Sequence, residues 1–179
     1  MAERLVVVSD MWGTKRGLWI ASYFGYLQQY YDIVFYDCQQ LGDIDVPVST
    51  EENVHKAFVE GGIDTAVAHL LKKESIPSHY LAFSTGGTIA YKAALKGLPM
   101  KSLTAVSATR IRMEDQKPKT PLHLIYGELD EFKPNAKWAK NLGIDLTVVP
   151  NFGHHLYSDE KIISQVSLGL LELATKKAV

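Results

Sequence analysis

Several features of membrane, extracellular and fibrous proteins are absent from this sequence. It contains a single cysteine, Cys38, so an internal disulfide cannot form, which fits a reducing compartment. No apolar run approaches the roughly 18 residues needed to span a bilayer, and the apolar run at 5–8 is too short for a signal peptide. Internal repeats and low-complexity tracts are also absent. We therefore expect a cytoplasmic protein.

An excess of charge of either sign is absent too. The chain has 19 Lys and Arg against 20 Asp and Glu, for a formal net charge of -1. Because no strong field would attract nucleic acid or an anionic membrane surface, we expect neither as a partner. Hydrophobic residues make up 46% and charged residues 22% of the 179 residues, as in ordinary soluble proteins. This length predicts one domain over residues 1–179.

Short apolar runs alternate with amphipathic stretches along the chain. The expected strands cover residues 5–9, 33–36, 80–83, 103–107, 122–126 and 144–149. The expected helices cover residues 17–30, 51–73, 85–96, 134–142 and 159–177, the second with a candidate break at Gly61-Gly62 and the last capped by Ser158. Residues 38–50 are turn-rich. This alternation predicts an α/β fold, a three-layer α/β/α sandwich around a mostly parallel six-stranded sheet.

The segment 81–88 carries the strongest chemical signal, because a strand there leads through a serine into a glycine-rich helix start. It reads LAFSTGGT, with Ser84 at the junction. Small residues at Ala82 and Gly86 permit a sharp turn that strains the serine backbone and lifts its hydroxyl above the sheet edge. The Thr85 N–H would lie at a helix N-terminus, where a developing oxyanion is favoured. Taken alone, the segment also fits a plain loop or a phosphate cradle.

An acidic residue and a histidine follow two later strands. Asp130 comes just after the strand at 122–126, and His154 just after the strand at 144–149. Functional residues in parallel sheets gather outside the carboxyl ends of the strands, so both can meet Ser84 at one edge. There an imidazole can remove the serine proton while a carboxylate fixes the imidazole tautomer.

Two neighbouring residues are weaker candidates for these roles. His155 could act as the base in place of His154, although adjacent side chains of an extended segment diverge. Glu128 is a minor alternative to Asp130 as the acid.

With these residues in this order, the chain resembles the α/β-hydrolase superfamily over nearly its whole length. The shared motifs are SxGG at 84–87, GxxD at 127–130 and GH at 153–154. The resemblance implies a serine hydrolase, of the carboxylesterase or thioesterase type, that transfers an acyl group to water through an acyl-enzyme. Its expected partner is a small-molecule acyl substrate, namely an ester, a thioester or an amide. The oligomeric state is not indicated by the sequence.

The resemblance also assigns roles to individual residues. It implies Ser84 as the nucleophile, Asp130 as the orienting acid and His154 as the general base. By position, the backbone N–H groups of Met11 and Thr85 would form the oxyanion hole. The remaining histidines lack the spacing of metal ligands, so we expect neither a metal nor another cofactor.

The loop after the first strand departs from the family pattern. The family often has His-Gly-x-x-Gly there, whereas residues 9–13 read SDMWG. A carboxylate at Asp10 would oppose an oxyanion unless it points away or pairs with a cation. This departure motivates an alternative function, a catalytically inactive α/β-hydrolase-like binding protein. Trp12 lies in the same loop and is expected to line the acyl pocket as a substrate-binding residue.

A third alternative is a doubly wound nucleotide-binding module, with Gly86-Gly87 cradling phosphate. It is disfavoured because neither a Gly-x-Gly-x-x-Gly nor a Walker-type motif occurs. It would also leave Asp130 and His154 without a role.

The short chain suggests which parts of the family fold are trimmed. The strand that leads into Ser84 is the third expected here, where the full family sheet places it fifth. We therefore expect the first two family strands to be absent, and a sheet order of 2-1-3-4-5-6. The place of the usual cap holds only residues 108–120, so we expect no large lid. The segment 38–60 is the expected source of a partial cover.

Overall fold

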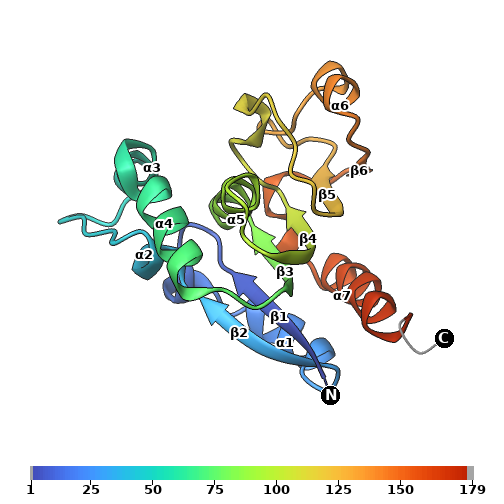
Figure 1. Ribbon diagram of the computed structural model, residues 1–179. Helices are drawn as coiled ribbons and strands as arrows, with labels where there is room; N and C mark the ends of the chain where they lie inside the picture. The colour runs from blue at the N-terminus through green and yellow to red at the C-terminus, as the bar shows by residue number, and fades with distance from the viewer. Residues whose placement is uncertain (1, 177–179) are drawn as a thin grey trace.

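A parallel six-stranded sheet forms the centre of the computed structural model, which describes residues 2–176 (Figure 1). Its strands are β1 (Glu3–Val8), β2 (Tyr31–Tyr36), β3 (Ser78–Phe83), β4 (Met100–Val106), β5 (Leu122–Gly127) and β6 (Leu146–Val149). Their order is β2-β1-β3-β4-β5-β6, and every neighbouring pair is parallel. The predicted strand order is therefore confirmed. Because all strands run the same way, their carboxyl ends share one edge.

Helices cover both faces of the sheet and complete three layers (Figure 1). They are α1 (Ile20–Leu27), α2 (Cys38–Leu41), α3 (Glu51–Ala57), α4 (Ile63–Lys73), α5 (Thr85–Leu95), α6 (Ala136–Leu142) and α7 (Glu160–Thr175). Helices α1 and α7 pack on one face, and α2 to α6 contribute to the core on the other. No helix within residues 2–176 has the length and apolar character needed to cross a membrane.

The strands at the centre are apolar because they are buried on both sides. In β1, Val6 and Val8 join the core under α4 and α5, whereas Leu5 and Val7 join the core under α1 and α7. All four side chains are fully buried. A strand covered on both faces has a continuous apolar sequence, which is why the strand β1 could be predicted from the sequence.

The structure corrects two local expectations and confirms a third. Residues 38–50, expected to be turns, contain α2, whose N-terminus is capped by the Asp37 carboxylate. The helical region 51–73 is interrupted by a π-type turn at Phe58–Gly62, which includes the glycine pair expected to break it. Helix α7 is capped by Asp159, whose carboxylate accepts a hydrogen bond from the Lys161 N–H, and not by Ser158.

Candidate active site

Ser84 lies at a sharp turn between β3 and α5. Its backbone has φ 50° and ψ -118°, a conformation that a non-glycine residue adopts only under strain. A Cβ at Gly86 would overlap the Ser9 carbonyl oxygen, so glycine at this position lets α5 begin directly against β1. The strained serine turn that the sequence predicted is confirmed. It presents the Ser84 hydroxyl at the carboxyl edge of the sheet.

His154 connects Ser84 to Asp130. The Ser84 Oγ lies 2.9 Å from His154 Nε2, and His154 Nδ1 lies 3.0 Å from Asp130 Oδ2. The Asp130 side chain is fully buried, whereas that of His154 is 18% exposed. A carboxylate at Nδ1 favours the tautomer with its hydrogen there, which leaves Nε2 free to accept the serine proton.

The turns around these side chains hold them in place. Asp130 Oδ1 accepts a hydrogen bond of 2.9 Å from the Phe132 N–H, so both carboxylate oxygens are engaged. The Ser107 hydroxyl, just after β4, donates a hydrogen bond of 2.7 Å to the His154 carbonyl oxygen. Sequence reasoning missed Ser107, although its position at the end of a strand was a usable signal.

The alternative base and acid have other partners. His155 is exposed, and its Nδ1 lies 3.3 Å from the Tyr157 hydroxyl. Glu128 accepts a hydrogen bond of 3.0 Å from the Asn151 N–H. Residues 154–158 form a 3-10 turn, so the extended segment expected there is wrong. The two histidine rings lie 5.2 Å apart, and it is His154 that contacts Ser84.

Asp10 is buried, and its carboxylate is engaged by two donors. Its Oδ1 accepts a hydrogen bond of 3.0 Å from the Trp12 N–H, and its Oδ2 accepts one of 3.1 Å from the Tyr157 hydroxyl. Burial raises the pKa of Asp10 above its ordinary value, although both hydrogen bonds favour the charged form. Tyr157, which the sequence analysis did not single out, thereby ties this loop to the turn that carries His154.

A second contact, from α2, holds the same loop. The side-chain amide of Gln39, on α2, donates a hydrogen bond of 2.9 Å to the Met11 carbonyl oxygen. The peptide between Met11 and Trp12 is therefore held at its carbonyl by Gln39 and at its N–H by Asp10. Thr85 is the first residue of α5, where backbone N–H groups have no acceptor within the helix.

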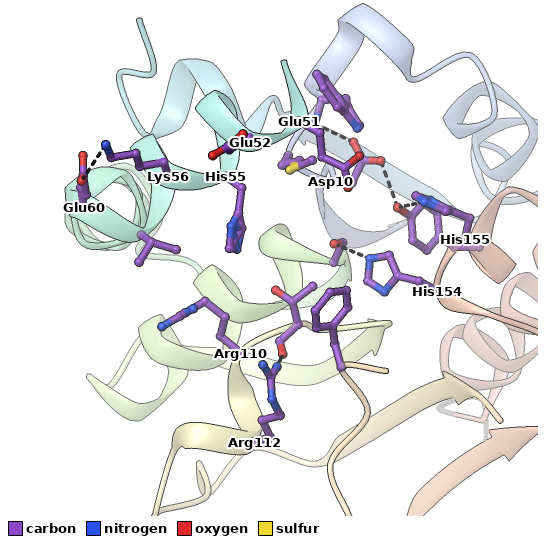
Figure 2. Close-up of a pocket in the computed structure, with 17 residues that line it drawn as sticks. Asp10, Glu51, Glu52, His55, Lys56, Glu60, Arg110, Arg112, His154 and His155 are labelled. Atoms are coloured by element: carbon purple, nitrogen blue, oxygen red, sulfur yellow. Dashed lines mark hydrogen bonds and ion pairs between the residues drawn. The ribbon is translucent and has the colours of Figure 1, made fainter. Parts of the chain in front are cut away.

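A pocket of about 820 Å³ opens onto Ser84 and His154 (Figure 2). Met11 and Trp12 line it, as does Phe132. One wall comes from α3 and the turn after it, which confirms the expected cover by part of 38–60. Its lining residues are Glu51, Glu52, His55, Lys56, Val59 and Glu60. The segment between β4 and β5 forms no large lid, and within residues 2–176 no cluster of three or more potential metal ligands occurs.

Comparisons with known proteins show a shared fold. No protein-family model matches the sequence, and no curated protein is significantly similar to it. Among solved structures, a Xanthomonas campestris pv. campestris protein assigned to the alpha/beta hydrolase superfamily has a TM-score of 0.67 at 17% identity, covering 95% of this chain and 98% of that one. Est1E from Butyrivibrio proteoclasticus with ferulic acid bound has a TM-score of 0.66 at 12% identity, covering 98% and 91%.

A third similar structure comes from a metagenome. MGS-MChE2, an alpha/beta hydrolase enzyme from sediments of the Mar Chica lagoon in Morocco, has a TM-score of 0.64 at 16% identity. The match covers 96% of this chain and 91% of that one.

Proposed function

From the α/β-hydrolase fold that this chain shares with those proteins, we propose that it is a serine hydrolase. Its substrate is a small ester, thioester or amide, and the reaction passes through an acyl-enzyme. One observation carries the proposal. His154 lies 2.9 Å from the Ser84 hydroxyl and 3.0 Å from the buried Asp130 carboxylate, at the base of an open pocket.

The proposed reaction has two steps. In the first, Ser84 Oγ attacks the acyl carbon while His154 Nε2 takes the serine proton, and the leaving group departs with that proton. In the second, a water molecule attacks the acyl-enzyme while His154 takes a proton from it and returns this proton to Ser84. Asp130 stabilises the imidazolium in both steps and stays ionised.

We further propose that the backbone N–H groups of Met11 and Thr85 stabilise the oxyanion. The first N–H groups of α5 lie at the positive end of the helix dipole. The two contacts that hold the peptide between Met11 and Trp12 support a fixed position for the loop. Trp12 is proposed to contact the acyl group, since it lines the pocket beside Ser84.

The geometry around Asp10 favours a hydrolase over an inactive binding protein. A free carboxylate beside the oxyanion would oppose the reaction. Both Asp10 oxygens instead accept hydrogen bonds, from the Trp12 N–H and the Tyr157 hydroxyl. The negative charge is thus shared with two donors, which reduces its opposition to a developing oxyanion.

Labelling with a fluorophosphonate probe tests the proposal. The probe phosphonylates an activated serine, so we expect it to label the native protein and not Ser84→Ala. Ser49→Ala is the matched control, because Ser49 is exposed and does not line the pocket. Circular dichroism checks that Ser84→Ala is folded. Absence of labelling in the native protein, under conditions that label a known esterase, would contradict the proposed function, as would equal labelling of Ser84→Ala.

A further inference from the structure

One side of the pocket is cationic, and we infer that the enzyme prefers substrates that carry a carboxylate remote from the scissile carbonyl. Arg110 is the residue that binds this carboxylate. The inference rests on the proposed function and names its substrate class. Arg110 lines the same pocket as Ser84 and His154, on the segment that follows β4.

The backbone of Arg110 is anchored beside the nucleophile. Its N–H donates a hydrogen bond of 3.3 Å to the hydroxyl of Thr88, on α5, the helix that begins directly after Ser84. The side chain is half-buried. A partly desolvated guanidinium binds a carboxylate more strongly than a fully exposed one, through paired charge-assisted hydrogen bonds.

The guanidinium of Arg110 has no protein partner within residues 2–176, since no carboxylate there forms an ion pair with it. The other cations of the pocket are engaged. Lys56 lies 3.8 Å from Glu60, and Arg112 donates to the Thr109 carbonyl and lies over the Phe132 ring. Arg110 is therefore the pocket cation left available for a ligand.

Four acidic residues line the pocket. The Asp10 carboxylate is engaged by the Trp12 N–H and the Tyr157 hydroxyl, and Glu60 lies 3.8 Å from Lys56. Figure 2 shows Glu51 and Glu52 on the side away from Arg110 and Arg112, with His55 between. Both acids occupy the first turn of α3, where the helix dipole stabilises negative charge. Arg110 and Arg112 thus form the cationic side of the pocket, while Val59, Phe132 and other apolar side chains offer contacts for the uncharged part of a substrate.

Two pairs of esters test the inference, one with the carboxylate on each side of the scissile bond. The first pair is the p-nitrophenyl monoester of adipic acid and its isostere in which an isopropyl group replaces the carboxylate. The second pair is p-acetoxybenzoate and its methyl ester. For at least one pair, we expect the native enzyme to show the higher kcat/KM for the anionic member. Added salt should reduce this preference because it screens the charge.

In Arg110→Gln, we expect the ratio of anionic to neutral kcat/KM to fall about 10- to 100-fold, mainly through KM, because one charge-assisted contact is lost. Arg110→Lys should recover only part of the ratio, because lysine keeps the positive charge but lacks the planar guanidinium that forms two hydrogen bonds to a carboxylate. Lys137→Gln, on the exposed face of α6, is the matched control and should leave both rates unchanged.

The outcomes separate this inference from the proposed function. Equal or lower activity on the anionic member of both pairs would overturn the carboxylate preference alone, as would an unchanged ratio in Arg110→Gln. Failure to hydrolyse any of the four esters, together with absence of probe labelling, would overturn the proposed function and this inference with it.

Discussion

Replacing Asp10 by alanine should destabilise the fold and slow the reaction. The change removes the acceptor for the Trp12 N–H at 3.0 Å and for the Tyr157 hydroxyl at 3.1 Å, and both residues are buried. A buried donor left without an acceptor costs about 1–3 kcal/mol. The Tyr157 hydroxyl can still use His155 Nδ1, at 3.3 Å, which leaves the Trp12 N–H as the donor without an acceptor. We therefore expect a loss of about 1–3 kcal/mol in the free energy of unfolding.

The same variant should lower kcat, because Asp10 holds the loop that carries Met11. Loss of one oxyanion donor costs about 10²- to 10³-fold in kcat, and a loosened loop should cost less, about 10- to 100-fold. Asp10→Asn is the matched control. Its side-chain oxygen can keep the Trp12 contact, and its amide can donate to the Tyr157 hydroxyl, so we expect a loss of stability below about 1 kcal/mol.

Urea unfolding and ester hydrolysis on the same samples measure these effects. Urea unfolding at several pH values also tests how the contribution of Asp10 to stability depends on pH. Burial raises the pKa of Asp10 above 3.8, so the native state holds the proton more tightly than the unfolded chain. The stability of native protein relative to Asp10→Asn should therefore fall as pH rises above 3.8, until the folded-state pKa is passed. Native-like stability and kcat in Asp10→Ala would refute the structural role of this carboxylate.

Two further predictions concern other carboxylates. Asp130→Asn should lower kcat by roughly 10³- to 10⁴-fold in steady-state ester hydrolysis with the fold intact, because the carboxylate that fixes the tautomer of His154 is lost. A loss below tenfold would count against the triad. Burial alone would raise the pKa of Glu74, but hydrogen bonds from Arg4 and Tyr36 together lower it below 4.5. The contribution of Glu74 to stability is therefore present above pH 4.5 and is lost as the pH falls through the folded-state pKa. The stability difference between native protein and Glu74→Gln, measured by urea unfolding, should be larger at neutral pH than in acid, and an equal difference at both would contradict this.

The main features of the fold were predictable from local sequence. The central strands β1 and β3 read as apolar runs because both of their faces are buried. The turn at Ser84 was predictable because only small neighbours permit it. Gly61 and Gly62 indicated the break between α3 and α4. The short α2 was missed because four residues are too few to show a helical period.

The details of the site were less predictable, because they depend on contacts between distant segments. Tyr157 lies in no recognisable motif, and Ser107 is marked only by its position at the end of a strand, yet their hydroxyls position the loop of Asp10 and the turn of His154. Arg110 lies in the segment 108–120, for which the sequence predicted only that no large lid forms. The structure shows that its backbone N–H contacts Thr88 and that it lines the pocket with Ser84.

The sequence by itself determined the α/β alternation, the strained serine turn and the placing of acid and histidine after separate strands, because each depends on residues close together in the chain. Only the tertiary structure decided that His154 and not His155 meets Ser84, and that the Asp10 carboxylate is engaged by Trp12. The reason is physical. A hydrogen bond depends on distance and direction to within a few tenths of an ångström, and the packing of separate elements sets both.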